Sequence, residues 1–281
     1  MALSFDGSSY LSRDLGGTGP ISSYSFSLAA WIKPPQEKKD WQDFVISDGT
    51  QTYRYGIGAG NYARWAIYWK GREDRTASDF SENYQTAEPN PWFHQVGIFA
   101  ADASRLAYVN GSGNSWSNAN NSPQTLTDPD IIGIGYGPTS GSNRYSKGEI
   151  AECALYNVAL DAKDIDALAA GFSPLFVKPS ALVGYWPLGG PLVSALSGAD
   201  VFGRYDLSIT GTLTETLHPP IFYPTPPHRT ATDVTPDPVI PGQGHDYALP
   251  DNVLDYALPD RRTEYALPES TPDYGVQPDG T

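Results

Sequence analysis

The chain has 281 residues, a formal net charge of −14 and a single cysteine. This acidic balance argues against a nucleic-acid partner, because phosphates require a basic surface, and one cysteine excludes an internal disulfide framework. The N-terminus lacks the basic and apolar regions of a signal peptide, and no apolar stretch approaches the roughly 20 residues that cross a bilayer. We therefore expect synthesis in a cytoplasm and no membrane partner.

Turn-forming and aromatic residues are abundant, with 28 glycines, 25 prolines, 18 tyrosines and 7 tryptophans. This composition favours an all-β sandwich or barrel. Alternation and turn signals predict strands over residues 3–11 (with a hairpin turn at Asp6-Gly7), 25–33, 44–47, 53–57, 64–70, 92–100, 106–109, 131–134 and 149–156. The clearest is 25–33, whose core face should carry Phe26, Leu28, Ala30 and Ile32.

One short helix is predicted after the last of these strands. Asp161 is a good N-cap, and Asp164 is placed to favour the helix N-terminus. Leu160 and Ile165 hold the positions of a hydrophobic staple, and Gly171 supplies the stop. The helix is an isolated element in an otherwise β protein.

Six segments carry a family resemblance: Leu3-Ser-Phe-Asp-Gly7, Phe26-Ser-Leu-Ala-Ala-Trp-Ile32, Trp92-Phe-His-Gln-Val96, Leu106-Ala-Tyr-Val-Asn-Gly111, Ile132-Gly-Ile-Gly135 and Gly148-Glu-Ile-Ala-Glu-Cys-Ala-Leu-Tyr-Asn-Val-Ala-Leu160. In this order and spacing they resemble the laminin-G-like, concanavalin A-like jelly rolls over residues 1–172. The resemblance implies a sandwich of two antiparallel sheets with Greek-key links, which the strand pattern favours independently.

Two further parts follow this domain. Residues 173–223 resemble the opening strands of a truncated second copy, and some fifty residues are too few for an independent sandwich. We expect this small β appendix to pack on the first domain or on a neighbouring subunit. Residues 224–281 are an extended, proline-rich tail with ten acids against three arginines, a net charge of −7.

The tail repeats a nine-residue unit. Asp-Tyr-Ala-Leu-Pro-Asp begins at Asp246 and again at Asp255, Glu-Tyr-Ala-Leu-Pro-Glu begins at Glu264, and a partial copy begins at Asp273. Each unit has too few apolar side chains to form a core, so a disordered acidic tail is one interpretation. The other is a multivalent tether to a protein surface, with the anchors Tyr247, Leu249, Tyr256, Leu258, Tyr265 and Leu267.

A second resemblance concerns the C-terminal half. The Gly-Phe-Ser-Pro-Leu join at 171–175, the strand Tyr185-Trp-Pro-Leu188 and the ending Pro219-Pro-Ile-Phe-Tyr-Pro224 resemble bacteriophage and prophage structural proteins. This resemblance implies a virion structural protein. Together with the repeated tail, it leads us to expect a non-enzymatic protein that decorates or cements a phage head through that tail. A major capsid or other virion protein would be its partner, the virion its location, and a homo-oligomer its expected state.

Catalytic patterns find little support in the sequence. The four histidines, at positions 94, 218, 228 and 245, are scattered and suggest neither a metal site nor a triad. Glu149 and Glu152 are three residues apart on a predicted strand, so strict alternation places them on opposite faces. Cys153 lies in the same apolar strand, which favours a buried structural thiol over a nucleophile. We assign no catalytic residue and expect no enzyme.

The alternative function is carbohydrate or receptor binding by a module of a phage tail or head fibre. Tyr62, Trp65 and Trp69 could form a stacking platform for a sugar ring. The alternative is that Trp65 and Trp69 are core residues, and we favour this alternative. No cofactor is predicted.

A structural calcium ion is a family expectation only. It would be held through the loop oxygens of Asp6, Asn110 and Asp128. The strand over 149–157 departs from the family pattern, because Ala151 stands where an acid commonly follows the isoleucine.

Overall fold

The computed structural model describes residues 1–17, 19–35, 42–47, 54–60, 64–68, 78–79, 92–101, 104–112, 115–117, 131–137, 144–193 and 196–224. The chain divides into two compact units, Met1–Pro227 and His228–Thr281, and every described residue belongs to the first. Within the described ranges, no helix is long and apolar enough to cross a membrane.

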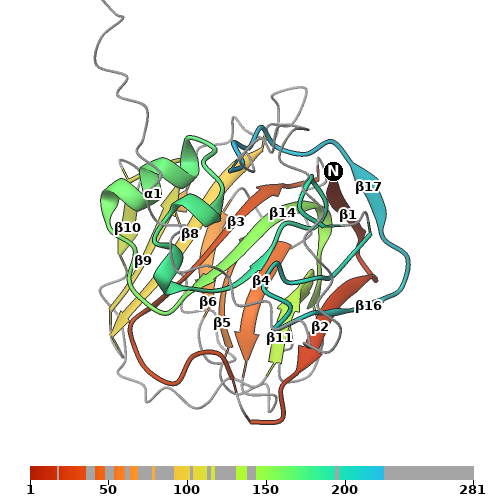
Figure 1. Ribbon diagram of the computed structural model, residues 1–281, viewed down its shortest axis with the longest axis horizontal. Helices are drawn as coiled ribbons and strands as arrows, with labels where there is room; N and C mark the ends of the chain where they lie inside the picture. The colour runs from red at the N-terminus through yellow and green to blue at the C-terminus, as the bar shows by residue number, and fades with distance from the viewer. Residues whose placement is uncertain are drawn as a thin grey trace, which may run out of the picture. The chain divides into compact units, whose positions relative to one another are not determined.

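The larger sheet has eight antiparallel strands in the described part of the chain. Seven of them follow one another in the order β10 (Ser115–Ser117), β9 (Ser104–Val109), β8 (Phe93–Ala101), β3 (Phe26–Lys33), β14 (Lys147–Tyr156), β1 (Ala2–Asp6) and β17 (Thr214–Thr216). Figure 1 shows two of the paired strands, β3 and β14, side by side. The long strand β14 pairs with β1 along its first half and with β15 (Leu182–Trp186) along its second half.

The smaller sheet has seven described strands, also antiparallel. Their order is β16 (Ser208–Thr210), β2 (Tyr10–Asp14), β11 (Ile131–Ile134), β4 (Gln42–Ser47), β5 (Arg54–Gly60), β6 (Arg64–Tyr68) and β7 (Ser78–Asp79). A two-stranded ribbon consists of β12 (Tyr136–Gly137) and β13 (Arg144–Tyr145). Two antiparallel sheets and one short helix confirm the predicted jelly-roll class.

The main core lies between the two sheets. Strand β3 contributes the four side chains predicted from alternation, Phe26, Leu28, Ala30 and Ile32, and all four are buried. The smaller sheet faces them with Phe44, Ile46, Ile57, Ile132 and Ile134. Alternation places one side chain in two in this core, so the strand pattern and the burial pattern have the same cause.

The predicted hairpin at Asp6-Gly7 is wrong. Strand β1 belongs to the larger sheet and β2 to the smaller one, so the turn carries the chain from one sheet to the other. Asp6 Oδ1 accepts hydrogen bonds from the amides of Ser8 (2.8 Å) and Ser9 (2.7 Å), and Gly7 has a positive φ of 88°. The Asp-Gly pair therefore makes a turn as expected, but turn chemistry does not specify which sheet receives the next strand.

Three strands from residues 173–223 extend both sheets. Strand β15 pairs with β14, β16 with β2, and β17 with β1. Trp186, at the end of β15, is fully buried in the main core, and its ring lies edge-on to Phe44 at a centroid distance of 5.8 Å. Its indole N–H donates to the carbonyl of Tyr205 at 2.8 Å, which satisfies the buried donor.

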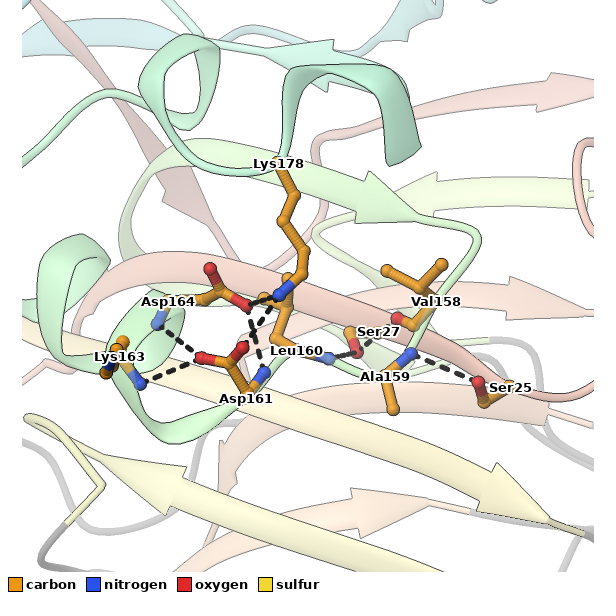
Figure 2. A network of polar contacts seen from close by, with 9 residues as sticks. All are labelled: Ser25, Ser27, Val158, Ala159, Leu160, Asp161, Lys163, Asp164 and Lys178. Carbon is orange, nitrogen blue, oxygen red and sulfur yellow. Dashed lines mark hydrogen bonds and ion pairs between the residues drawn. The ribbon is translucent and has the colours of Figure 1, made fainter.

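The helix α1 (Ala162–Ala169) begins and ends as predicted. Asp161 Oδ1 accepts from the amides of Lys163 (3.0 Å) and Asp164 (3.1 Å), and Asp164 Oδ2 accepts from the amide of Asp161 (3.0 Å), which completes a capping box (Figure 2). Lys178 Nζ pairs with both carboxylates. The hydrogen bond from Lys178 is the first cause that lowers the pKa of Asp161 to about 2.

Two serines bind the residues that precede this helix. Ser25 lies directly before β3, and Ser27 lies within it. Ser27 Oγ donates to the carbonyl of Val158 (2.8 Å) and accepts from the amide of Leu160 (3.1 Å), while Ser25 Oγ accepts from the amide of Ala159 (3.1 Å) (Figure 2). The helix is thereby attached to the larger sheet on the face opposite the main core, where a second cluster contains Val96, Tyr156, Ile165, Leu168 and Tyr185.

Candidate functional site

Three half-buried tyrosines gather on the smaller sheet: Tyr10 from β2, Tyr136 from β12 and Tyr145 from β13. The Tyr10 and Tyr136 rings are stacked with centroids 4.7 Å apart, and Tyr145 lies 5.5 Å from Tyr10 and 5.9 Å from Tyr136. We call these residues the tyrosine cluster. Tyr136 and Tyr145 are paired across the ribbon of β12 and β13, whereas Tyr10 is distant in sequence and only the tertiary structure brings it to them.

The tyrosine cluster lies on the outer face of this sheet. Leu11 is buried in the main core, so its neighbour Tyr10 is directed to the opposite face. Gly133 has the same orientation, because Ile132 and Ile134 on either side of it are core residues. A Cβ at Gly133 would lie 2.9 Å from the carbonyl oxygen of Tyr136, so glycine is what allows Tyr136 to approach the sheet closely.

Backbone hydrogen bonds hold the ribbon that carries two of the tyrosines. The amide of Ser146 donates to the carbonyl of Gly135 (3.0 Å), and the amide of Gly7 donates to the carbonyl of Ser146 (2.9 Å). Gly135 has a positive φ of 71° and faces the ring of Phe5, which leaves no room for a side chain. The ribbon is thus pinned to the turn between β1 and β2.

The phenol groups of the tyrosine cluster are partly shielded from water, and this changes the pKa of Tyr136. Burial raises the pKa of Tyr136, and the neighbouring phenols of Tyr10 and Tyr145 raise it further. The hydroxyl of Tyr136 therefore remains protonated at neutral pH, and a phenol hydroxyl can both donate and accept hydrogen bonds. Aromatic faces next to hydroxyl groups suit a ligand with both C–H faces and hydroxyls, and they provide no acid–base pair for catalysis.

A second cluster surrounds Glu152, which occupies a β-bulge in β14. The pairing of β14 with β3 shifts between Ala151 and Ala154, and Glu152 has a positive φ of 56°. The bulge gives β14 one extra residue, so the alternation used in the sequence prediction does not hold across it. That prediction could not anticipate the bulge, because no glycine or proline marks it.

The carboxylate of Glu152 is buried, with 1% of the side chain exposed. Tyr185 donates its hydroxyl to Oε2 at 2.5 Å, Tyr223 donates to Oε1 at 2.7 Å, and His218 Nε2 lies 3.1 Å from Oε1. We call these four residues the Glu152 clasp. Burial and the charge of Glu152 raise the pKa values of Tyr185 and Tyr223.

The two glutamates of β14 do not form a catalytic pair. Glu149 Oε1 pairs with Lys33 at 2.9 Å, and its Oε2 accepts the hydroxyl of Thr216 at 3.0 Å. Glu152 binds a different set of partners and is closed off from solvent. Hydrolysis by two carboxylates requires both to face one substrate cleft, and these two share no partner.

The residues suggested for calcium do not converge on one ion. Asp6 ends β1 and Asn110 follows β9, and β14, β3 and β8 lie between these strands. At about 4.8 Å per strand the two residues are roughly 19 Å apart. Asn110 Oδ1 also accepts the amide of His94 at 2.9 Å. Asp128 lies outside the described residues, and within the described ranges no group of His, Cys, Asp or Glu could hold a metal ion.

The other predicted site residues lie outside what the structure describes. Tyr62 and Trp69 are not described, and for Trp65 only the backbone is, paired with Ala59 and Ser78. The predicted tail anchors are not described either: Tyr247, Leu249, Tyr256, Leu258, Tyr265 and Leu267.

Cys153 and His94 are two further reactive side chains, and both are buried. Cys153 is buried in the main core as predicted, and burial raises the pKa of its thiol well above the ordinary value. His94 is 2% exposed, its ring lies 5.3 Å from Trp31, and its Nδ1 has no hydrogen-bond partner among the described residues. Burial lowers the pKa of His94 to about 3, so the imidazole is neutral in the folded protein.

Sequence reasoning missed both clusters. Ile132-Gly-Ile-Gly135 predicts a strand, but nothing in this segment indicates that Gly133 accommodates Tyr136. The available hint was a tyrosine between two glycines directly after a buried strand, a combination that favours a short ribbon. The Glu152 clasp offers no comparable signal, since its members come from β14, β15 and the residues after β17.

A family model described as the concanavalin A-like lectin/glucanases superfamily matches residues 5–166. The chain belongs to this superfamily. The match ends before β15 and so omits the three strands that complete the sheets. Domains of this superfamily and of the laminin G type are typically non-catalytic binding modules.

Solved structures similar to this chain include three whose source is named. A heptameric pentraxin from Limulus polyphemus is 14% identical with a TM-score of 0.46, over 60% of this chain and 81% of that one. A putative carbohydrate-binding protein from Bacteroides ovatus is 20% identical with a TM-score of 0.49, over 79% of this chain and 61% of that one. Domains LG4-5 of the mouse laminin α1 chain are 14% identical with a TM-score of 0.42, over 55% and 40%. No match was found among curated protein sequences.

Proposed function

We propose that this superfamily member is a non-enzymatic binding module that recognises carbohydrate through the tyrosine cluster. The supporting observation is the cluster itself, three tyrosines 4.7 to 5.9 Å apart on the outer face of a sheet. The name of the superfamily includes lectins, and the two acids of β14 are each engaged by other partners.

Stacking on an aromatic ring is a physically reasonable way to hold a sugar. The apolar C–H face of the sugar covers the ring while its hydroxyls bond to polar groups at the rim. In this cluster the rings of Tyr10 and Tyr136 are already stacked on each other, which fixes their orientation. A ligand would therefore pay little for ordering these two side chains.

Replacing Tyr136 by alanine should weaken glycan binding roughly tenfold or more, because one stacking ring is lost. The measurement is a glycan array followed by calorimetry on the strongest hit, with circular dichroism to show that the fold is kept. Tyr136→Phe is the matched control, because it keeps the ring and should retain most of the affinity.

The alternative platform predicted from the sequence is tested in the same experiment. Loss of binding in Trp65→Ala or Trp69→Ala, with Tyr136→Ala unaffected, would move the site to the predicted tryptophans. No binding of the unmodified protein to any glycan would refute the proposal and favour a purely structural role.

A second candidate function is attachment to a virion, in which the C-terminal tail binds a capsid or other shell protein and the chain decorates a phage head. The repeat of nine residues favours it. Ordering the 58 residues of the tail costs on the order of 50–100 kcal/mol of backbone entropy, so only a large partner surface can hold it. An extended nine-residue step spans about 30 Å, a suitable spacing for equivalent sites on a repeating shell.

The first compact unit, Met1–Pro227, has three exposed phenylalanines that contact one another, and one of them closely precedes the tail in sequence. Phe172, Phe176 and Phe222 are 42%, 45% and 62% exposed, and the Phe172 ring contacts the other two at 6.3 and 5.9 Å. Exposed apolar groups of this kind are typical of protein interfaces. A shell protein bound by the tail would supply the partner for this surface.

Deleting residues 228–281 should abolish incorporation of the protein into phage particles, because the deletion removes all repeated anchors at once. Mass spectrometry of purified particles, after complementation with the shortened gene, measures the occupancy. A variant in which all six Tyr and Leu anchors are replaced by serine keeps the length of the tail. It is the matched control, and it should also fail to be incorporated. Normal occupancy of the shortened protein would rule this function out.

A further inference from the structure

Given the carbohydrate-binding function proposed above, on which this inference rests, we propose that strand β16 forms the second half of the site. The hydroxyls of Thr210 and Ser208 hydrogen-bond a neutral sugar chain whose first unit stacks on Tyr10. The superfamily model matches residues 5–166, so β16 lies outside the matched part of the chain. The two serine and threonine hydroxyls supply the polar contacts that a stacking ring alone does not.

The tyrosine cluster covers only one face of the Tyr10 ring. Tyr136 is stacked on that face, with the ring centroids 4.7 Å apart. Tyr145 does not cover the second face, because a ring placed there would be much farther from Tyr136 than from Tyr10. The Tyr145 ring is instead nearly equidistant from the two, at 5.5 Å from Tyr10 and 5.9 Å from Tyr136. The cluster thus leaves the second face of Tyr10 for a stacked sugar.

The position of Tyr136 determines which way this second face is directed. Strand β2, which carries Tyr10, lies between β11 and β16 in the sheet. Tyr136 lies over Gly133 of β11, since a Cβ at Gly133 would be 3.3 Å from the Cδ1 ring atom of Tyr136. With Tyr136 on the β11 side, the opposite face of the stacked Tyr10 ring is on the β16 side. Strand β16 ends this sheet within the described ranges, so no further described strand lies beyond it.

Strand β16 presents hydroxyl groups beside this ring. In the antiparallel register Thr210 is opposite Tyr10 and Ser208 is opposite Ser12. Directly opposite residues have their side chains on the same face, with Cβ atoms about 5 Å apart. Thr210 and Ser208 are exposed, and no side-chain hydrogen bond found among the described residues involves the hydroxyl of Thr210, Ser208 or Ser12. These hydroxyls can therefore donate to and accept from a ligand.

The spacing and charge of this surface define the class of ligand. Thr210 and Ser208 are two residues apart, about 7 Å along the strand, so a sugar on Tyr10 contacts Thr210 and a second linked unit reaches Ser208. After Ser12, the next residue of β2 that alternation places on this face is Asp14, whose negative charge disfavours acidic sugars. The net charge of −14 acts in the same direction. The ligand class is a neutral oligosaccharide.

Two substitutions of Thr210 separate a hydrogen bond to the sugar from a role in strand shape. Thr210→Val keeps the branched side chain and removes the hydroxyl, so it should weaken binding of the strongest array hit by about three- to tenfold, the effect of one hydrogen bond. Thr210→Ser keeps the hydroxyl and should retain most of the affinity. Calorimetry on the full chain measures both variants. Thr214→Val, on the edge strand β17 of the larger sheet, is the matched control and should bind like the unmodified protein.

Ser208→Ala tests the contact with the second sugar unit. It should weaken binding of the oligosaccharide by a similar factor and leave binding of the first unit alone, measured by competition, unchanged. An equal effect on both ligands, or no effect on either, would contradict this contact, and array hits confined to acidic glycans would contradict the ligand class.

Unchanged affinity in Thr210→Val, or a loss in Thr210→Ser with full affinity in Thr210→Val, would overturn the role of β16. If Tyr136→Ala still abolished binding in that case, the tyrosine cluster would stand as the site without β16. No glycan binding by the unmodified protein would instead refute the proposed function, and the role of β16 with it.

Discussion

A chain ending at Phe172 will fail to fold, whereas a chain ending at Pro227 will unfold in one cooperative transition. The shorter chain lacks three strands, β15, β16 and β17, that pair with β14, β2 and β1. It also lacks four side chains of the main core, which are Trp186, Leu188, Leu207 and Leu213. Losing one such large side chain typically costs about 3–5 kcal/mol, and whole domains are stable by only about 5–15 kcal/mol.

Circular dichroism and urea denaturation test whether the chain ending at Phe172 and the chain ending at Pro227 are folded and unfold cooperatively. A point variant separates core loss from chain length: Trp186→Ala in the full protein should lower the free energy of unfolding by about 3–5 kcal/mol. A cooperative transition in the chain that ends at Phe172 would contradict this prediction. It would show instead that residues 1–172 are an independent domain and that the following strands are an addition to it.

The folded protein should lose stability on acidification because of His94. The pKa of this residue is about 3 in the folded state and about 6.5 when unfolded. Between these values the unfolded chain binds a proton that the folded chain does not, so the stabilisation is present above about pH 6.5 and declines as the pH falls towards 3. At pH 5 the loss amounts to about 2 kcal/mol.

His94→Gln isolates this contribution, because glutamine does not titrate. Urea denaturation at pH 7 and pH 5 should show a decrease for the unmodified protein that is about 2 kcal/mol larger than the decrease for the variant. The comparison cancels the carboxylates that titrate in both proteins, such as Asp6, whose pKa is lowered to about 2 by the amides of Ser8 and Ser9. Equal decreases in the two proteins would mean that His94 gains a proton in the folded state.

Local sequence predicted those parts of the fold that depend on local interactions. Alternation along residues 26–32 placed the core face of β3 correctly. Asp161, Asp164 and Gly171 defined the helix, and Gly171 ends it with a positive φ of 89° and hydrogen bonds to the preceding turn. These features succeed because the responsible groups are within a few residues of each other.

The candidate site could not be predicted in the same way. Tyr136 and Tyr145 pair within one short ribbon, but Tyr10 joins them only because β2 and β11 are neighbours in the sheet and Gly133 lets Tyr136 approach it closely. The sequence pattern instead favours Trp65 and Trp69, because aromatic alternation within one segment is visible in a sequence, whereas the approach of two distant segments is not. The tail anchors remain a prediction from the repeat.

The sequence by itself determined the all-β class, the strand faces, the single capped helix, the acidic charge and the nine-residue repeat. Each is a property of composition or of residues close together along the chain. Tertiary structure alone decided that the Asp6-Gly7 turn crosses between sheets, that residues 182–216 complete both of them, and that a bulge turns Glu152 toward Tyr185, His218 and Tyr223. Such contacts depend on which segments become neighbours when the core is buried, and that is settled by the whole chain at once.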